Sequence, residues 1–127
     1  MHKFIKSPED VLAISYSGTI TGNDLDVAVD RLEAMLARPG KVHFFIEMKD
    51  IQSLELAAMP HHWSRSLPML GKLDRFGRVA VVADQGWMRV LTRLESALLP
   101  NVSYRVYEPQ EREEALDWAF GKESVAA

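Results

Sequence analysis

Segments with the spacing of a β-strand and segments with the spacing of an α-helix alternate along this chain. Short apolar runs rich in β-branched and aromatic residues occur at Val11–Tyr16, Val42–Ile46 and Arg78–Asp84. Helical apolar spacing follows each of them, beginning with Leu25, Ala28, Leu32 and Leu36. This alternation predicts an α/β fold in which helical crossovers connect parallel strands.

The remaining elements complete one sheet. His2–Ile5 is a weaker strand, and the turn-forming Ser7–Asp10 predicts that it forms a hairpin with the strand at Val11. Tyr104–Tyr107 alternates and is typical of a strand near an edge. Further helical spacing is seen in Met59, Trp63, Leu67 and Leu70, in Trp87, Leu91, Leu94 and Leu98, and in Ala115, Trp118 and Ala119. We therefore expect a single mixed, mostly parallel sheet of about five strands.

Local signals mark where these elements begin and end. Thr21 and Asp24 have the spacing of a helix cap, and Arg38–Gly40 contains the proline and glycine that end a helix. Gly18 is expected to end the strand that begins at Val11, and the polar stretch Glu47–Ser53 is expected to be a loop.

Length and composition limit the other possibilities. A chain of 127 residues forms one domain, here expected over residues 1–121 with a frayed tail at 122–127. The absence of cysteine excludes disulfides and thiolate metal sites. A net charge of -3 argues against a nucleic-acid partner, and no apolar run reaches the length of a membrane span. The expected location is the cytoplasm.

Several of these segments also match a family pattern. Gly18–Thr21, Phe44–Glu47, Arg78–Asp84 followed by Trp87, and Ala115–Trp118 resemble the SpoIIAA-like family. The resemblance runs from about Val11 to Trp118. It implies a STAS-like fold, related in shape to the CRAL-TRIO lipid-binding domains, and no established activity.

The resemblance raises the question of a phosphorylation switch. The anti-sigma-factor antagonists that give the family its name carry a phosphorylatable serine in an Asp-Ser-Ser-Gly type motif, after the strand equivalent to Val42–Ile46. The corresponding stretch here is Lys49–Leu54, with Ser53 as its one serine, no acidic neighbour and no glycine. This difference favours Ser53 as an ordinary loop or cap residue, with a regulatory site as the alternative.

Acidic residues cluster where open parallel sheets hold ligands. Asp84 and Trp87 follow the clearest strand, and Glu47, Asp50 and Glu108 follow two others. One interpretation is that Asp84 caps the helix that begins near Trp87. The other is that the five side chains line a cleft.

Met59 and His62 complete the predicted ligand or partner surface. They lie in the helical segment Met59–Leu70, whose two prolines make it a candidate lid, and methionine offers adaptable apolar surface. Two interpretations remain for a set of basic residues: they form a small positive patch, or they are an ordinary solvated surface, which is the usual case. The set is Arg65, Lys72, Arg75, Arg78, Arg89 and Arg93.

Motifs for catalysis and for metal binding are missing from the sequence. It contains no nucleophile elbow, phosphate-cradling loop or His-Glu-x-x-His zinc motif, and the adjacent His61 and His62 point about 100° apart on a helix. We therefore expect no catalytic residues, no metal and no cofactor.

Three functional hypotheses remain. The leading one is a non-catalytic binding module that acts through protein contacts, as a monomer or a homodimer. The first alternative is a carrier or sensor of a small apolar ligand such as a lipid, and the second is an enzyme of unknown class.

Overall fold

The computed structural model describes residues 1–54, 74–84, 86–87, 89, 92–93 and 102–122. Its centre is a five-stranded sheet in the order β1-β2-β3-β4-β5, which confirms the expected mixed sheet. The strands are β1 (His2–Phe4), β2 (Val11–Ile20), β3 (Val42–Leu54), β4 (Phe76–Val82) and β5 (Ser103–Tyr107). Only β1 is antiparallel to its neighbour, because it forms the predicted hairpin with β2.

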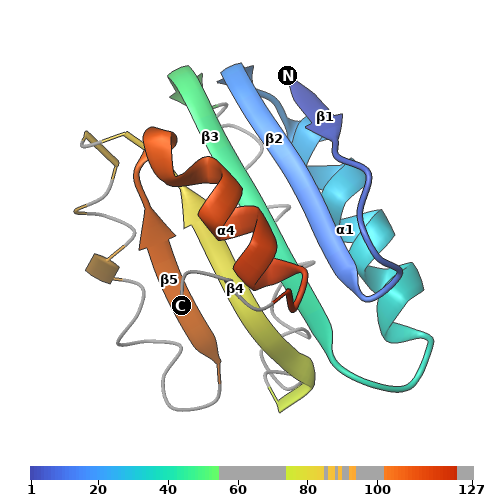
Figure 1. The fold of residues 1–127 in the computed structure, drawn as a ribbon. Helices are drawn as coiled ribbons and strands as arrows, with labels where there is room; N and C mark the ends of the chain where they lie inside the picture. Colours follow the sequence, from blue (N-terminus) through green and yellow to red (C-terminus); the bar gives the residue numbers. More distant parts are fainter. Residues whose placement is uncertain (55–73, 85, 88, 90–91, 94–101, 123–127) are drawn as a thin grey trace, which may run out of the picture.

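Among the described elements, one helix covers each face of this sheet (Figure 1). Helix α1 (Gly22–Leu36) joins β2 to β3, and helix α4 (Arg112–Ala119) follows β5 after the 3-10 turn η3 (Pro109–Glu111). The α1 cap is the predicted one, since Thr21 and Asp24 form a reciprocal capping box.

Alternating side chains along the strands build a core on each face of the sheet. On β2, Leu12 packs toward α1, whereas Val11 and Ala13 pack toward α4. The α4 side is built from small residues where the helix approaches the sheet, because Ala80 and Ala115 are both fully buried there. Short side chains let a helix lie close to the strands, which fixes α4 over β3 and β4.

The expected end of β2 and the expected loop after β3 are wrong. β2 continues past Gly18 to Ile20, and β3 includes the whole Glu47–Ser53 stretch. The two strands stay paired through Thr19↔Ser53, with register shifts beside Gly18. Gly18 and Asp50 have φ values of 63° and 51°, so this pair of positions absorbs the irregularity of a bulge.

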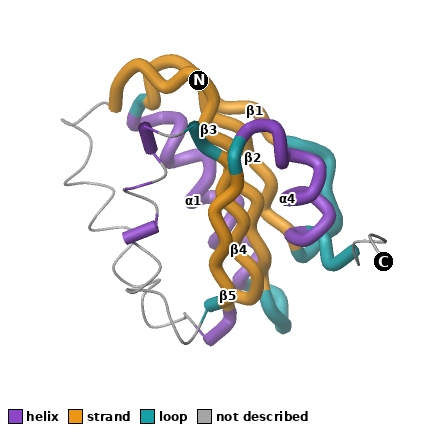
Figure 2. Tube along the Cα trace, turned by 60° about the vertical axis from the view of Figure 1, so that its left-hand side comes forward, coloured by secondary structure: helices purple, strands orange, loops and turns teal. Residues whose placement is uncertain are grey.

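These extra residues form a projecting ribbon. The β3–β4 pairing ends at Glu47↔Val82, while β3 runs on to Leu54 beside β2. Figures 1 and 2 show β2 and β3 extending beyond the ends of the other strands. We call residues 17–20 and 48–54 the β2–β3 ribbon. Its exposed side chains are polar, whereas Ile20 and Ile51 pack in one cluster with Leu25 and Ala28 of α1.

Candidate functional site

A hollow of about 270 Å³ lies at the carboxyl ends of β3 and β4. Three of the predicted acidic residues, Glu47, Asp50 and Asp84, line it, because parallel strands bring their carboxyl ends to one edge. The other lining residues are Met48, Lys49, Val82, Pro109 and Arg112. We call this the carboxyl-end hollow.

Glu47 and Arg112 form the wall of the carboxyl-end hollow on the α4 side. Arg112 Nε donates to Glu47 Oε2 at 2.8 Å, and Glu47 is only 9% exposed. A carboxylate this buried needs a cationic partner, so the pair holds the start of α4 against β3. Sequence reasoning missed Arg112. The signal was present, since Arg112 is a single basic residue between Glu111 and Glu113.

Asp84 has the geometry of a helix cap. Its Oδ1 accepts hydrogen bonds from the backbone N–H groups of Gly86 at 3.0 Å and Trp87 at 3.3 Å. Trp87 itself is half-buried and packs against the core on the α1 side of the sheet. The structure therefore places Asp84 in the carboxyl-end hollow and Trp87 in the opposite core.

Ser53 and Glu108 are not among the residues that line the carboxyl-end hollow. Ser53 is exposed on the β2–β3 ribbon, where its Oγ is 3.0 Å from Thr19 Oγ1. Glu108 precedes η3, and its backbone N–H donates to Glu111 Oε1 at 2.8 Å. The predicted residues Met59 and His62, with the proposed lid Met59–Leu70, lie outside the described residues.

A second, larger hollow of about 580 Å³ lies on the α4 side of the sheet, over β1 and β2. Its lining residues are Lys3, Phe4, Ile5, Lys6, Ser15, Glu47, Lys49 and Arg112. We call it the lysine hollow. It shares Glu47, Lys49 and Arg112 with the carboxyl-end hollow, so the buried ion pair lies between the two.

The positive patch expected from the sequence has a different role where it is described. Arg75 donates to the backbone carbonyls of Leu36, Arg38 and Gly40, and Arg78 Nη2 donates to Ala119 O at 3.2 Å. Both guanidinium groups thus donate hydrogen bonds to carbonyls at the C-terminal ends of α1 and α4. The lysines of the lysine hollow were missed because strand register, which sequence does not give, brings them together.

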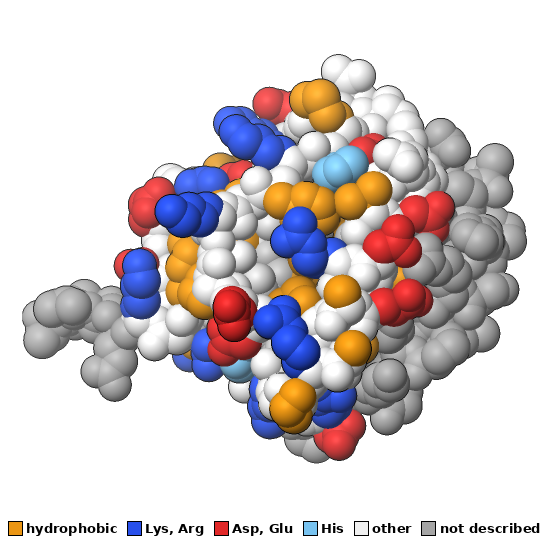
Figure 3. Space-filling view, turned by 90° about the vertical axis from the view of Figure 1, so that its right-hand side faces the viewer, with side chains coloured by type: hydrophobic (Ala, Val, Ile, Leu, Met, Phe, Trp, Pro, Cys, Tyr) orange, Lys and Arg blue, Asp and Glu red, His pale blue; other side chains and the backbone are white. Residues whose placement is uncertain are grey.

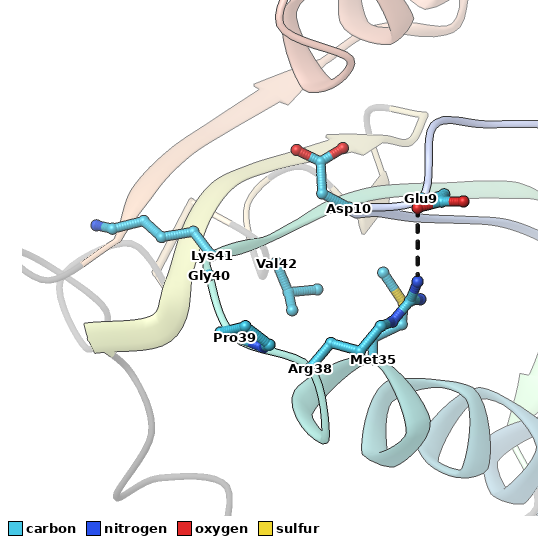
Figure 4. Close-up of a pocket in the computed structure, with 8 residues that line it drawn as sticks. All are labelled: Glu9, Asp10, Met35, Arg38, Pro39, Gly40, Lys41 and Val42. Atoms are coloured by element: carbon cyan, nitrogen blue, oxygen red, sulfur yellow. Dashed lines mark ion pairs between the residues drawn. The ribbon is translucent and has the colours of Figure 1, made fainter.

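A third hollow, of about 280 Å³, lies at the amino ends of β2 and β3 (Figure 4). The ion pair between Arg38 Nη1 and Glu9 Oε2 spans it at 3.7 Å, with side chains 57% and 93% exposed. Lys41 points away from the other lining side chains. An ion pair this exposed contributes little, so this hollow is a surface feature at the end opposite the predicted site.

The described residues offer neither a metal site nor a membrane-spanning helix. No set of three or more His, Asp or Glu side chains there is close enough to hold a metal ion. In the same part of the chain, no helix has the length and apolar character needed to cross a membrane.

Comparison with known proteins agrees with this architecture. A crystal structure of an uncharacterised protein from the DUF3478 family with a SpoIIAA-like fold, from Shewanella loihica PV-4, matches with a TM-score of 0.65. The two chains are 23% identical, and the match covers 94% of this chain and 92% of that one. A search of the curated proteins found no significant match. The family model described as SpoIIAA-like matches residues 11–119, and the chain belongs to the SpoIIAA-like family.

Proposed function

We propose that this protein is a non-catalytic regulatory module of the cytoplasm that acts through protein contacts, with the β2–β3 ribbon as its docking surface. The observation that carries the proposal is the continuation of β3 from Met48 to Leu54, beyond its last pair with β4 at Glu47↔Val82. Within the described residues, this edge of β3 has no strand partner. An unpaired strand edge is a template on which another protein adds a strand.

The side chains beside this edge support the same function. Gln52 and Ser53 are exposed on the β2–β3 ribbon, and Asp50 and Asp84 line the adjoining carboxyl-end hollow. A docked strand would form backbone hydrogen bonds along β3 and present its side chains to this hollow, which supplies specificity. A second copy of the chain is one such partner.

The apolar-carrier alternative has less support. The three hollows described above all include charged side chains in their lining. A carrier of a lipid-like ligand needs an enclosed and mainly apolar cavity. The lid that this alternative requires, Met59–Leu70, lies outside the described residues.

Quantitative affinity capture tests the docking surface. Gln52→Lys adds a charge to the strand edge, which is how natural edge strands block pairing. We expect the amount of captured protein to fall by roughly 10-fold, equivalent to about 1.4 kcal/mol. Glu9→Gln is the matched control, because it changes the net charge by the same amount at an exposed position at the other end of the sheet.

Two further measurements decide between the hypotheses. Hydrogen exchange in the captured complex must slow at the amides of residues 48–54. Unchanged exchange there, or equal loss of capture in both variants, would contradict docking at the β2–β3 ribbon. Native mass spectrometry of the untagged protein shows whether it forms a homodimer. A stoichiometric lipid-like adduct in the same measurement would favour the carrier instead.

A further inference from the structure

The lysine hollow exists because α4 covers only part of its face of the sheet. Helix α4 packs against β3 and β4, while β1 and β2 extend to the side of it (Figure 1). The side chains of Lys3 and Ser15 share this face, since the two residues are paired across β1 and β2. The volume of about 580 Å³ lies within the usual range for small-molecule sites.

The lining of this hollow is strongly positive. It contains the cationic residues Lys3, Lys6, Lys49 and Arg112 and a single carboxylate, Glu47. That carboxylate is already bound to Arg112. Within the described residues, none of the three lysines has an ion-pair partner. The whole chain nevertheless carries a net charge of -3, so this concentration of positive charge is local.

Like charges around one hollow repel each other, and a bound anion removes that repulsion. Figure 3, which views the molecule from its β1 side, shows Lys and Arg side chains around a depression in the surface. The three exposed ammonium groups are mobile donors, and the half-buried Ser15 adds a hydroxyl donor on the floor formed by β2. An anion with several charged groups could contact more than one lysine at once.

We propose that the lysine hollow binds a small, multiply charged anion that carries phosphate or carboxylate groups. This site adjoins the β2–β3 ribbon, with which it shares Lys49, but it extends over β1 and β2, and its ligand is a small anion and not a docked strand. Ser15 and the lysines hold the anion. The ion pair of Arg112 with Glu47 keeps the neighbouring wall in place.

The test is a titration of the full chain followed by two-dimensional amide NMR at low ionic strength. Pyrophosphate and citrate are the probes, added separately, and they distinguish phosphate from carboxylate chemistry. We expect saturable shifts in the amide signals of Lys3, Ser15 and Lys49 with at least one probe. Added salt should weaken the binding, because exposed charges are screened.

Two variants make the test specific. The double variant Lys3→Gln/Lys49→Gln should weaken binding by about 10-fold, since it removes two of the three exposed ammonium groups that would contact the anion. Lys41→Gln, at the amino end of β3 and directed away from its own hollow, should change the affinity by less than about 2-fold. Both variants alter exposed residues, so the amide spectrum of a folded protein should persist.

Three outcomes would overturn the proposal. The first is the absence of saturable shifts with both probes. The second is equal weakening by Lys41→Gln, which would mean that the anions only respond to overall charge. The third is that a Glu-rich peptide saturates the same amides while neither small anion does, which would assign the hollow to an acidic segment of a protein.

Discussion

At the scale of single residues, Asp24 both caps helix α1 and holds the N-terminal residues Met1 and His2. Its carboxylate receives hydrogen bonds from the Thr21 backbone at 2.8 Å and lies 2.7 Å from His2 Nδ1. Burial alone would raise its pKa, but the hydrogen bonds from Thr21, His2 and the terminal ammonium hold that pKa well below its usual range. Burial and the nearby Asp24 charge together raise the pKa of Tyr16 to about 12.

The lowered pKa of Asp24 predicts a pH dependence of stability. Because the folded state favours the ionised form, this stabilisation is complete above about pH 5, begins to decrease as the pH falls below the ordinary value near 4, and is fully lost only below the lowered pKa of the folded state. We expect Asp24→Asn to lower the free energy of unfolding by about 1–2 kcal/mol at pH 7. Urea unfolding of both proteins from pH 7 to pH 3 checks this, and a difference that stays constant down to pH 3 would contradict it.

His43 on β3 lies directly against Gly77 on β4. The imidazole of His43 fills the space that a Cβ at Gly77 would need, and His43 Nδ1 accepts the backbone N–H of Arg78 at 2.8 Å. Burial first, and then the nearby Arg78 charge, lower the pKa of His43. The neutral ring is therefore the form that fits this site.

Gly77→Ala should destabilise the fold by about 1–3 kcal/mol, because the imidazole must move. In a His43→Ala background the same change should cost much less, as a double-mutant cycle of chemical unfolding would show. Additive costs would refute the contact. The lowered pKa also predicts that the stability contributed by neutral His43 is lost as the pH falls below about 6.5, and NMR titration of the ring measures that pKa directly.

At the scale of elements, the C-terminal end of α1 depends on an arginine from a distant part of the chain. No basic residue lies in the last turn of α1, and Arg75 instead donates to Leu36 O at 3.2 Å and Gly40 O at 2.9 Å. It also donates to Arg38 O. The guanidinium thus satisfies carbonyls that a helix end leaves without partners.

Arg75→Lys should lower the free energy of unfolding by about 1–2 kcal/mol, because one ammonium group cannot bridge three carbonyls. Amide exchange should accelerate in the last turn of α1. Arg89→Lys is the control, since Arg89 is exposed. Both substitutions keep the positive charge, so equal effects would contradict a role for the fork geometry of Arg75.

The elements also show how far sequence reasoning reaches. The β1–β2 hairpin, the Thr21 cap and the edge strand β5 followed from local patterns, because local chemistry determines turns, caps and alternation. The end of β3 did not. Four of its residues, Lys49, Asp50, Gln52 and Ser53, are polar and exposed, so this part of the strand has the composition of a loop.

At the scale of the whole molecule, the buried pair of Glu47 and Arg112 links the sheet to α4. Arg112→Gln should lower the free energy of unfolding by about 2 kcal/mol, less than for a fully buried pair because the Arg112 side chain is 37% exposed. The double variant Glu47→Gln/Arg112→Gln should recover part of that loss. Chemical unfolding of the two variants measures both effects, and a double variant less stable than Arg112→Gln would contradict this account.

The candidate site was predictable only in part, because some of its residues come together through contacts between segments that are far apart in the sequence. Glu47, Asp50 and Asp84 could be placed at one edge because the rule for parallel strands needs only their positions in the chain. Lys3 and Lys49 could not be joined, because they meet through the register of three strands and the partial cover of α4.

The order of the strands in space is their order in the chain, from β1 to β5. Each new strand therefore adds to the edge formed by the strand made just before it, and no strand must be inserted between two others. As the chain leaves the ribosome, the sheet is able to grow from β1 outward without rearrangement. The strands can then join the sheet in the order in which they are synthesised.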